Sequence, residues 1–444
     1  MSSTEPRERG TGTQDRVLDA DPPEPMSEPD AAAPETPETP ETPLIKNWNF
    51  QALWSSEAFA AVAKETAEIA YPLLILATTG STLFAGIVGS AQLITASLIS
   101  IPAGTLADRL DRRLLLMGCN LVRVVLLALF SVLIFTDSAN MAVIFAIALS
   151  SAVCFGLSQP AGLAAIKALV PASQLTQATA QNQIRYFGAT VAGPPIGGAL
   201  FGVARAFPYL AAAVSFLVSS LLLLFVRKPM QSEQSRSAKE KGGTVEGFRF
   251  LFKQPILRPL IIWIMGSNMA FTHSGVFLAL IATAQGRGAS ESFIGATLAV
   301  AGLGGLFGSL IAGWVFKKVK PSVIVLYGAW IGPVVAILLA VTPGVIPLGV
   351  IVTLVFIRGP IISTLFLSYL AAVAPDKVQG RVLGAVFFMS MSAAPIGVFL
   401  VGAVFDLAGS TWVFITMCVI SGVAALPTLT KRIRTLPAPE AVAV

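Results

Sequence analysis

The sequence is poor in residues that bind metals. Its 444 residues include one histidine, His273, and three cysteines, Cys119, Cys154 and Cys418. The cysteines all fall in apolar segments and lack the spacing of metal ligands. We therefore expect no zinc or haem chemistry, and we interpret the cysteines as packing residues.

Charged residues are scarce as well. Asp, Glu, Lys and Arg make up 12% of the chain, whereas 55% of the residues are apolar and the mean hydropathy is +0.76. Charged residues make up about 25% of a typical soluble protein. The composition therefore predicts a polytopic membrane protein.

Two kinds of catalytic machinery are missing from the sequence. It has no Gly-x-x-x-x-Gly-Lys-Ser/Thr loop for nucleotide phosphates. It also has no convergent set of nucleophile, acid–base and metal residues. We therefore predict a protein that is not an enzyme and that needs no cofactor.

What the chain does have is a series of long apolar segments. Each has about 18 residues or more, enough to cross a hydrocarbon core of ~30 Å as a helix. They predict an all-α protein with twelve transmembrane helices, six on either side of a polar stretch. In chain order the segments are 50–77, 83–106, 114–136, 141–166, 178–204, 207–226, 257–284, 292–316, 322–341, 346–373, 382–405 and 411–429.

These segments divide the chain into five parts. Residues 45–226 and 257–429 each hold six of them, and the polar central loop 227–256 joins these two parts. Residues 1–44 contain eleven acidic residues, three arginines and a repeated Glu-Thr-Pro, so we expect a disordered tail there. Such a tail does not match a secretory signal peptide, and we expect the first apolar segment to direct insertion. Residues 430–444 form a C-terminal tail.

Lysine and arginine mark one side of the membrane. If both termini are cytoplasmic, the cytoplasmic segments after the acidic tail hold twenty-one lysines and arginines, and the external loops hold only Arg205 and Arg287. Positive residues stay on the cytoplasmic side of short loops. We therefore predict a multi-pass protein of the cell inner (plasma) membrane with both termini cytoplasmic. Its basic residues should attract anionic membrane lipids, and we expect no binding to nucleic acid.

The most specific motif lies between the second and third apolar segments. Residues 104–113 read Gly-Thr-Leu-Ala-Asp-Arg-Leu-Asp-Arg-Arg, with five charges in a turn that must lie at the membrane surface. This string resembles the signature loop between helices 2 and 3 of the major facilitator superfamily of transporters. The resemblance implies two six-helix bundles around a central cavity, which opens to each side of the membrane in turn.

The resemblance also implies a role for this loop as a conformational latch. Asp108 would face the N-terminus of the eleventh helix, near Gln379, and this contact between charge and helix dipole would hold the cytoplasmic side shut. Gly104 would allow the close approach of the two helices. Three arginines would anchor to lipid headgroups: Arg109, Arg112 and Arg113. The alternative, that these charges only set the topology, remains open.

An internal repeat supports the division into two similar halves. Pro195-Ile196-Gly197 in the fifth segment is matched by Pro395-Ile396-Gly397 in the eleventh. Repeats of this kind are typical of transporters whose two halves rock about a shared substrate site.

A second motif lies in the fifth segment, where Gly-Pro-Pro-Ile-Gly-Gly gives a flat, kinked helix face. It resembles the motif that marks exporters within the superfamily and implies a seal between the halves on the external side. Outward transport is therefore favoured, with generic helix packing as the alternative. Gly304 and Gly308 in the eighth segment form a small face that could match it. The motif residues are Gly193, Pro194, Gly197 and Gly198.

Further segments are similar to one branch of the superfamily, the branch of enterobactin exporters and macrolide-efflux proteins. The likeness covers residues 48 to about 430. It implies export of a bulky amphipathic molecule, such as an antibiotic, a natural product or a siderophore. The segments are Leu53-Trp54, Tyr71-Pro72-Leu73-Leu74, Gln159-Pro160-Ala161, Glu246-Gly247-Phe248-Arg249-Phe250-Leu251, Pro375-Asp376 and Gly380-Arg381.

Ionisable residues inside the first apolar segment point to the energy source. Lys64 and Glu68 are four residues apart on one helix face, and Glu57 lies at a depth similar to that of Arg185, with which it could pair. A carboxylate that exchanges a cation for a proton would couple export to the proton gradient. Glu65 and Glu68 are the preferred proton carriers. Structural ion pairing without proton transfer is the alternative.

Polar residues in other apolar segments are candidates for the substrate cavity. Arg358 precedes a Gly-Pro pair, where a kink could expose it to an anionic substrate, or it could instead bind a backbone carbonyl. The other candidates are His273, Asn268, Gln92, Asn182 and Gln183.

These patterns together predict a monomeric secondary active efflux transporter. It would export a small amphipathic molecule by proton antiport with alternating access. The alternative is a proton-coupled importer of a small organic solute, which would keep the first motif but has no use for the external seal of the second.

Overall fold

The computed structural model describes residues 43–231, 244–373 and 376–438. The chain divides into two compact units, Met1–Pro43 and Leu44–Val444, and every element named below belongs to the second. The acidic tail predicted for residues 1–44 lies almost wholly outside the described residues. Some side chains within described helices also lie outside the description, among them those of Asp108 and Arg381.

The first half of this unit contains six long helices, preceded by the short 3-10 helix η1 (Leu44–Lys46). Asn47, Ser81, Asp111 and Asn140 each cap the helix that follows by accepting a backbone N–H bond. The six helices are α1 (Trp48–Thr79), α2 (Thr82–Arg109), α3 (Arg112–Phe135), α4 (Met141–Leu169), α5 (Leu175–Val203) and α6 (Phe207–Leu223).

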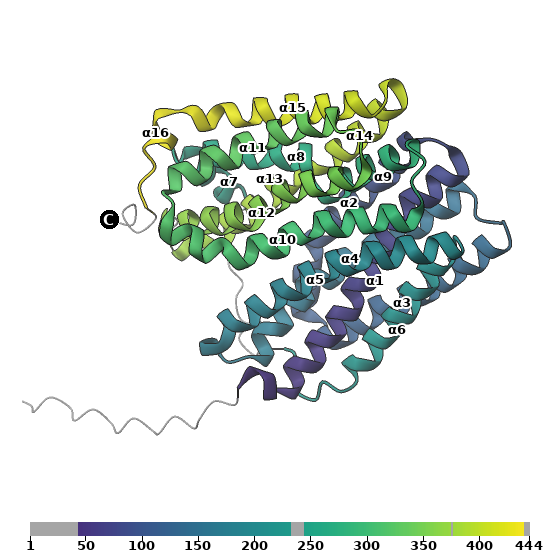
Figure 1. Cartoon of the computed structure of the whole chain (residues 1–444). Coiled ribbons are helices and arrows are strands. Elements are labelled where there is room, and N and C mark those ends of the chain that lie inside the picture. The colour runs from purple at the N-terminus through teal and green to yellow at the C-terminus, as the bar shows by residue number, and fades with distance from the viewer. Residues whose placement is uncertain (1–42, 232–243, 374–375, 439–444) are drawn as a thin grey trace, which may run out of the picture. The chain divides into compact units, whose positions relative to one another are not determined.

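The second half is also helical (Figure 1). Its elements are α7 (Thr244–Lys253), α8 (Leu257–Phe271), α9 (His273–Gly286), α10 (Glu291–Lys318), α11 (Pro321–Val341), α12 (Val345–Val373), α13 (Asp376–Ser392), α14 (Ala394–Ala408), α15 (Ser410–Ala425), η4 (Leu426–Leu429) and α16 (Lys431–Arg434).

Two of the predicted segments each consist of two consecutive helices in the structure. The seventh divides at Thr272, whose ψ of 144° is not helical, into α8 and α9. The eleventh divides near Ala393 into α13 and α14, and Pro395 stands in the first turn of α14. Proline cannot donate to the carbonyl four residues before it, so one helical hydrogen bond is missing at the second break.

Within the described residues, nine helical stretches are long and apolar enough to cross a membrane. They coincide with nine of the predicted segments. The other three are α6, which has only 17 residues, α1 and α5. α1 carries four charged side chains, and the first half of α5 is polar. α1 and α5 are therefore more polar than helices that only face lipid. Charged residues inside a membrane are rare and usually functional.

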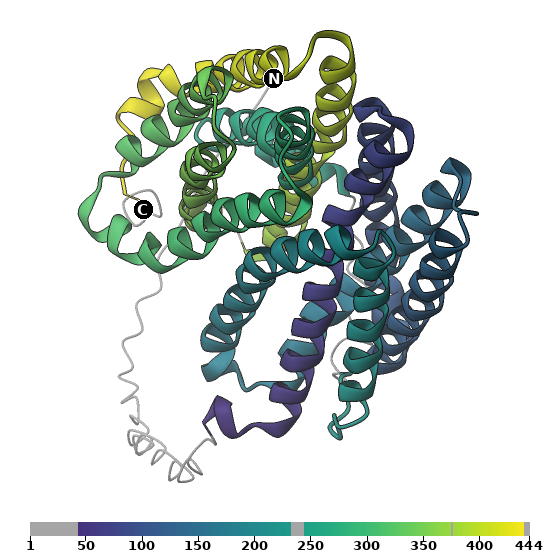
Figure 2. The same ribbon diagram turned by 45° about the vertical axis from the view of Figure 1, so that its right-hand side comes forward.

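The helices gather in two bundles with the same internal contacts (Figures 1 and 2). In the first bundle α1 contacts α5 and α6, α2 contacts α4, and α3 contacts α4 and α6. In the second, α8 contacts α14 and α15, α10 contacts α12, and α11 contacts α12 and α15. The two contact patterns correspond helix by helix, so the predicted fold of two pseudo-symmetric bundles is confirmed.

The repeated Pro-Ile-Gly motif makes the same contact in both bundles. A Cβ on Gly197 would lie 2.8 Å from the carbonyl oxygen of Thr66 on α1. A Cβ on Gly397 would lie 2.7 Å from the carbonyl carbon of Met269 on α8. Both distances are shorter than real Cβ contacts, so each helix needs glycine to approach its partner this closely.

The bundles meet mainly through α5 with α10 and α2 with α14, and also where α9 contacts α1 and α2 and where α13 contacts α2. We call the end of the bundles where α1 joins α2 the Gly80 end, and the opposite end, where α1 begins, the Lys46 end. The contacts between α2 and α14 lie in the half of α2 nearer the Gly80 end and run along α14 from Pro395 to Asp406.

Candidate functional site

A cluster of ionisable side chains lies in the middle of α1. Lys64 forms ion pairs with Glu65 Oε1, at 3.0 Å, and with Glu68. Glu65 is only 4% exposed, whereas Lys64 and Glu68 are partly exposed. The spacings of one and four residues place both carboxylates within reach of one ammonium group.

The second bundle completes this cluster through the first two residues of α9. His273 Nε2 lies 3.1 Å from Glu65 Oε2, and the Ser274 hydroxyl donates to Glu68 Oε1 at 2.6 Å. The break at Thr272 makes this possible, because it begins a new helix next to α1. The N-terminus of a helix carries a partial positive charge, which favours nearby carboxylates. We call Lys64, Glu65, Glu68, His273 and Ser274 the interface cluster.

The interface cluster holds more acidic groups than basic ones that are always charged. It contains two carboxylates and one ammonium, so with His273 neutral it carries one uncompensated negative charge. A proton on His273, or on one carboxylate, would balance the charges. Burial of an unbalanced charge is costly within a membrane.

Aromatic rings surround the interface cluster. The ring of His273 lies 4.0 Å from that of Phe277 and 5.8 Å from that of Phe356, measured between centroids. Lys64 Nζ lies 5.3 Å from the ring centre of Phe155 on α4. The cluster is therefore bordered by apolar surface from both bundles.

Glu57 and Arg185 form a separate pair nearer the Lys46 end. Arg185 Nη1 lies 3.6 Å from Glu57 Oε2 and donates to the Glu57 carbonyl oxygen at 2.8 Å. The same guanidinium donates twice to Asn182 Oδ1, at 2.7 and 3.1 Å. These contacts use Arg185 within the first bundle, so it is not the partner of Glu65 or Glu68.

The other cavity candidates lie apart from the interface cluster. Arg358 donates to the Gly328 carbonyl oxygen and to the Ser267 hydroxyl, at 2.9 and 2.6 Å, so the backbone-carbonyl alternative is the arrangement found. Asn268 donates to the Ser390 carbonyl oxygen at 2.8 Å and Gln92 to that of Ala148 at 3.5 Å, while Gln183 is exposed.

The glycine face of α5 packs against one helix of each bundle, α1 and α10. A Cβ on Gly193 would lie 3.0 Å from the carbonyl carbon of Glu65, so this glycine supports the backbone of the interface cluster. A Cβ on Gly198 would lie 3.1 Å from Gly295 Cα on α10, in the other bundle. The motif therefore joins α1 and α10 through a single helix.

The face expected to match it on α10 was predicted wrongly. A Cβ on Gly304 would meet Phe356 Cβ at 3.0 Å and one on Gly308 would meet Ile357 Cα at 2.9 Å, both on α12 of the same bundle. The glycines of α10 that meet α5 are Gly295, Gly302 and Gly305. Both sets of glycines have helical spacing, and spacing alone does not say which set faces which neighbour.

The signature loop is only partly described. The side chain of Asp108 and the predicted contact near Gln379 lie outside the described residues. The space beside Gly104 is open in this conformation, and Arg109 is exposed. Asp111 accepts from the backbone N–H groups of Arg113 and Leu114 and so caps α3.

The prediction that Arg112 anchors to lipid headgroups was wrong. Its side chain is 3% exposed and donates to the carbonyl oxygens of Ala107, Ala164 and Met230, at 3.1, 3.2 and 2.9 Å. It thus links the end of α2 to α4 and to the segment after α6. Arg113 donates to the Leu224 carbonyl oxygen at 2.9 Å.

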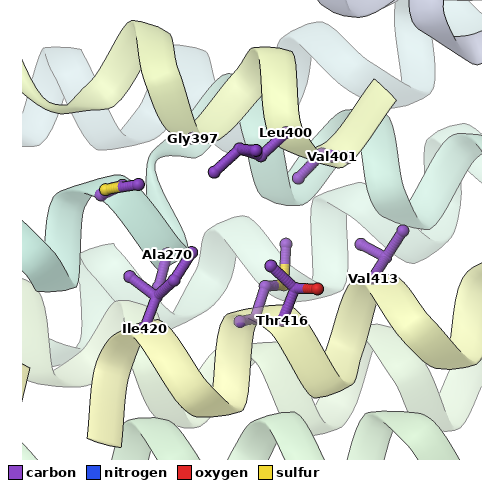
Figure 3. A pocket seen from close by; sticks show the side chains of 9 residues that line it. Ala270, Gly397, Leu400, Val401, Val413, Thr416 and Ile420 are labelled. Carbon is purple, nitrogen blue, oxygen red and sulfur yellow. The ribbon is translucent and has the colours of Figure 1, made fainter. Parts of the chain in front are cut away.

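Among the described residues, cavities lie outside the interface cluster at two places. One of about 10 Å³ lies between α8, α14 and α15, and its lining, which includes Ala270, Val401 and Thr416, has no ionisable group (Figure 3). It is too small for an organic solute. A cleft of about 230 Å³ at the Lys46 end is lined by Ile45, Gln51, Trp54, Gln181 and Ile184.

Sequence reasoning missed Ser274 as a member of the interface cluster. A single serine after the only histidine carries no pattern, and no proline marks the break at Thr272. The carboxylates and Lys64 could be predicted as site residues because charged side chains in an apolar segment are energetically costly and usually functional. Their partners on α9 depend on how the bundles meet.

Comparison with known proteins gives a family and several relatives. The model of the Major Facilitator Superfamily matches residues 53–398. The multidrug efflux pump Tap of Mycolicibacterium fortuitum is 26% identical over 366 residues, covering 79% of this chain and 87% of the pump. The enterobactin exporter EntS of Escherichia coli O1:K1 / APEC is 27% identical over 367 residues, covering 80% and 84%.

Solved structures support the fold. A bacterial homolog of the human lysosomal transporter Spinster, inward-facing and unoccupied, has a TM-score of 0.68 at 15% identity, covering 87% of this chain and 97% of that one. A bacterial homologue of the iron transporter ferroportin, also inward-facing, has a TM-score of 0.64 at 15% identity, covering 88% and 100%.

Proposed function

The chain belongs to the Major Facilitator Superfamily, and we propose that it is a secondary active efflux transporter that exports a small amphipathic molecule by proton antiport. The membership predicted from residues 104–113 is thereby confirmed, as is the resemblance to enterobactin exporters. The observation that carries the proposal is the interface cluster, in which a lysine and two carboxylates of one bundle bind two residues of the other.

The proposed direction rests on relatives and on packing. Both the pump Tap and the exporter EntS are efflux proteins by name, and both align with about four fifths of this chain. The Gly-Pro-x-x-Gly-Gly face of α5 holds α1 and α10 together, as a seal between the bundles must. An exporter needs such a seal against re-entry of its substrate.

We propose that the Gly80 end is external and that residues 1–44, 227–256 and 430–444 are cytoplasmic. The bundles then meet tightly on the external side in this conformation, through α2 with α14 and α5 with α10. Two structures with the same fold are inward-facing. The conformation is thus suited to take up substrate from the cytoplasm.

The charge of the interface cluster supports the proposal of proton coupling. While Glu65 and Glu68 are ionised, they bind His273 and Ser274 and hold α9 against α1. A proton that enters from the external side in the outward-facing state neutralises a carboxylate and weakens its bond to Lys64. Return to the inward-facing state exposes the cluster to the cytoplasm, where the proton leaves. No cofactor is needed, because the gradient supplies the energy.

The surroundings of the interface cluster support an amphipathic substrate. Phe155, Phe277 and Phe356 lie against its charged or titratable groups and offer apolar surface from both bundles. Apolar walls with a few polar groups are typical of small-molecule sites. We therefore propose a substrate with a polar or charged group attached to a bulky apolar body.

An importer of a small organic solute is the second candidate, because the interface cluster could couple protons to either direction. The test is transport in proteoliposomes of known orientation, with an imposed pH gradient and a panel of antibiotics and siderophores. We expect substrate to move opposite to protons. Movement of substrate together with protons would contradict antiport, and growth of a drug-sensitive host on the same panel identifies compounds to test.

A further inference from the structure

A carboxylate of the second bundle binds the start of a helix in the first. Asp406, in the last turn of α14, accepts from the backbone N–H of Thr82 at 2.8 Å and from that of Leu83 at 3.1 Å. It also accepts from the hydroxyl of Ser81, which is the N-cap residue of α2. The first N–H groups of a helix have no partner within the helix, and they carry its positive dipole end. Asp406 satisfies two of them from across the boundary.

Close backbone packing reinforces this contact. A Cβ on Gly402 would lie 2.6 Å from the Thr82 carbonyl oxygen, and one on Gly86 would lie 3.1 Å from Gly402 Cα. Farther along, the Ser90 hydroxyl donates to the Pro395 carbonyl oxygen at 2.8 Å. The first turns of α2 therefore lie along α14, and separation of the bundles at the Gly80 end must break the Asp406 bonds.

The equivalent contact on the other side of the pseudo-twofold axis has no such acid. Gly402 contacts the first and fifth residues of α2, and Gly198 contacts the first and fifth residues of α10, so Gly202 stands at the position of Asp406. There α10 begins with its own Ser290, which accepts from the N–H of Phe293. Thus α5 packs closely on α10 without a carboxylate from the opposite bundle. Close packing of α2 on α14 therefore does not by itself require Asp406.

We propose that Asp406 is an anionic latch that holds the Gly80 end closed and must be released for that end to open. This inference rests on the proposed function, because only an alternating-access transporter has to open that end. The latch explains why a charge lies at a contact between helices that are otherwise joined by small residues. It acts on the N-terminus of α2, whereas the predicted Asp108 latch acts at the opposite end of the same helix.

The Asp406 and Asp108 latches lie at opposite ends of α2, so the two contacts would form in turn. α2 runs from the Gly80 end to the Lys46 end, and α13 and α14 together run in the opposite direction. Asp108, near the C-terminal end of α2, could then face the N-terminus of α13, as Asp406, near the C-terminal end of α14, faces the N-terminus of α2. Rocking of the bundles that makes one contact would break the second.

The test measures opening of the Gly80 end directly. Spin labels are placed at Ser138→Cys and Thr411→Cys, which are exposed in the two bundles at this end, after the three native cysteines are replaced by serine. Asp406→Asn keeps the shape of the side chain and removes its charge. We expect the population with the longer distance to increase roughly fivefold or more, as loss of a charge–dipole contact predicts.

Two further variants sharpen the result. Thr82→Pro removes one donor to Asp406 at the first position of α2, where proline is well tolerated, and should open the same end to a smaller extent. Asp137→Asn removes an exposed acid in the loop between α3 and α4, and should leave the distances unchanged. Distances in Asp406→Asn and Thr82→Pro that match the parent would overturn the latch. Because this readout needs no substrate, a failure to detect export would leave the latch standing and would count against the proposed function alone.

Discussion

Glu65 of α1 and His273 of α9 bind each other across the boundary between the two bundles, with 3.1 Å between Oε2 and Nε2. The carboxylate is almost fully buried, and its second oxygen binds Lys64. Any separation of α1 from α9 must therefore break a contact to a buried charge. Under the proposed proton antiport, this contact would couple the position of the bundles to the ionisation of the interface cluster.

The first prediction concerns the carboxylates of the interface cluster. The double variant Glu65→Gln, Glu68→Gln keeps the size of both side chains but can no longer exchange protons. We expect its transport to lose dependence on the pH gradient, measured as substrate flux in proteoliposomes with and without that gradient. The control is Asp137→Asn, an exposed loop residue outside the cluster. Unchanged gradient-driven export by the double variant would make these acids structural.

The second prediction separates the two roles that His273 could have. His273→Ala removes the hydrogen bond to a charged carboxylate, and we expect gradient-driven export to fall about tenfold or more. His273→Gln can still donate to Glu65 but cannot titrate near neutral pH, so it should retain most of the activity. If His273→Gln is as inactive as His273→Ala, then His273 itself carries the proton.

The third prediction concerns the contact between α5 and α10. Gly198→Ala places a methyl group 3.1 Å from Gly295 Cα, and overpacking of this kind costs about 1–3 kcal/mol. We expect the Gly80 end to open and transport to fall, measured by the labelled-cysteine distances and by flux. Gly188→Ala is the matched control on the same helix, because nothing lies within 4 Å of its Cβ position. Equal behaviour of the two variants would show that the α5 face is not a seal.

The fourth prediction follows from the buried position of Arg112. Arg112→Ala removes a donor from three backbone carbonyls, and each buried carbonyl that is left unsatisfied costs about 1–3 kcal/mol. We expect the melting temperature in detergent to fall by about 5 °C or more. Arg109→Ala, at an exposed position in the same loop, should change it little. An equal fall in the melting temperature of both variants would support the earlier prediction that these arginines act alike at the membrane surface.

The fold could be predicted from the sequence because each membrane helix is identified by the apolar length of its own segment. Apolar length gave the positions of the helices, and the Pro-Ile-Gly repeat gave their pseudo-symmetry, since Gly197 and Gly397 make equivalent contacts. Glu57 and Arg185 lie together, as their similar depths suggested.

Features that depend on how the bundles meet could not be predicted in the same way. The helix break at Thr272 has no proline to mark it, and Ser274 and Asp406 gain their partners only across the boundary. Gly304 and Gly308 have the spacing of an interface but face their own bundle. The burial of Arg112 likewise depends on carbonyls from distant segments.

The last prediction returns to the signature loop. Asp108→Asn should abolish transport, because the neutral amide cannot hold the N-terminus of the eleventh helix by charge, while insertion and protein level persist. Asp111→Asn is the matched control in the same loop. Asp111 caps α3 through the N–H groups of Arg113 and Leu114, and asparagine caps a helix as well as aspartate does. If the loop charges only set topology, both variants lose one negative charge at the same membrane surface and should transport alike. Flux and membrane level measured side by side therefore decide between a latch and a topology signal: loss of flux in Asp108→Asn alone supports the latch, and equal flux in the two variants ends it.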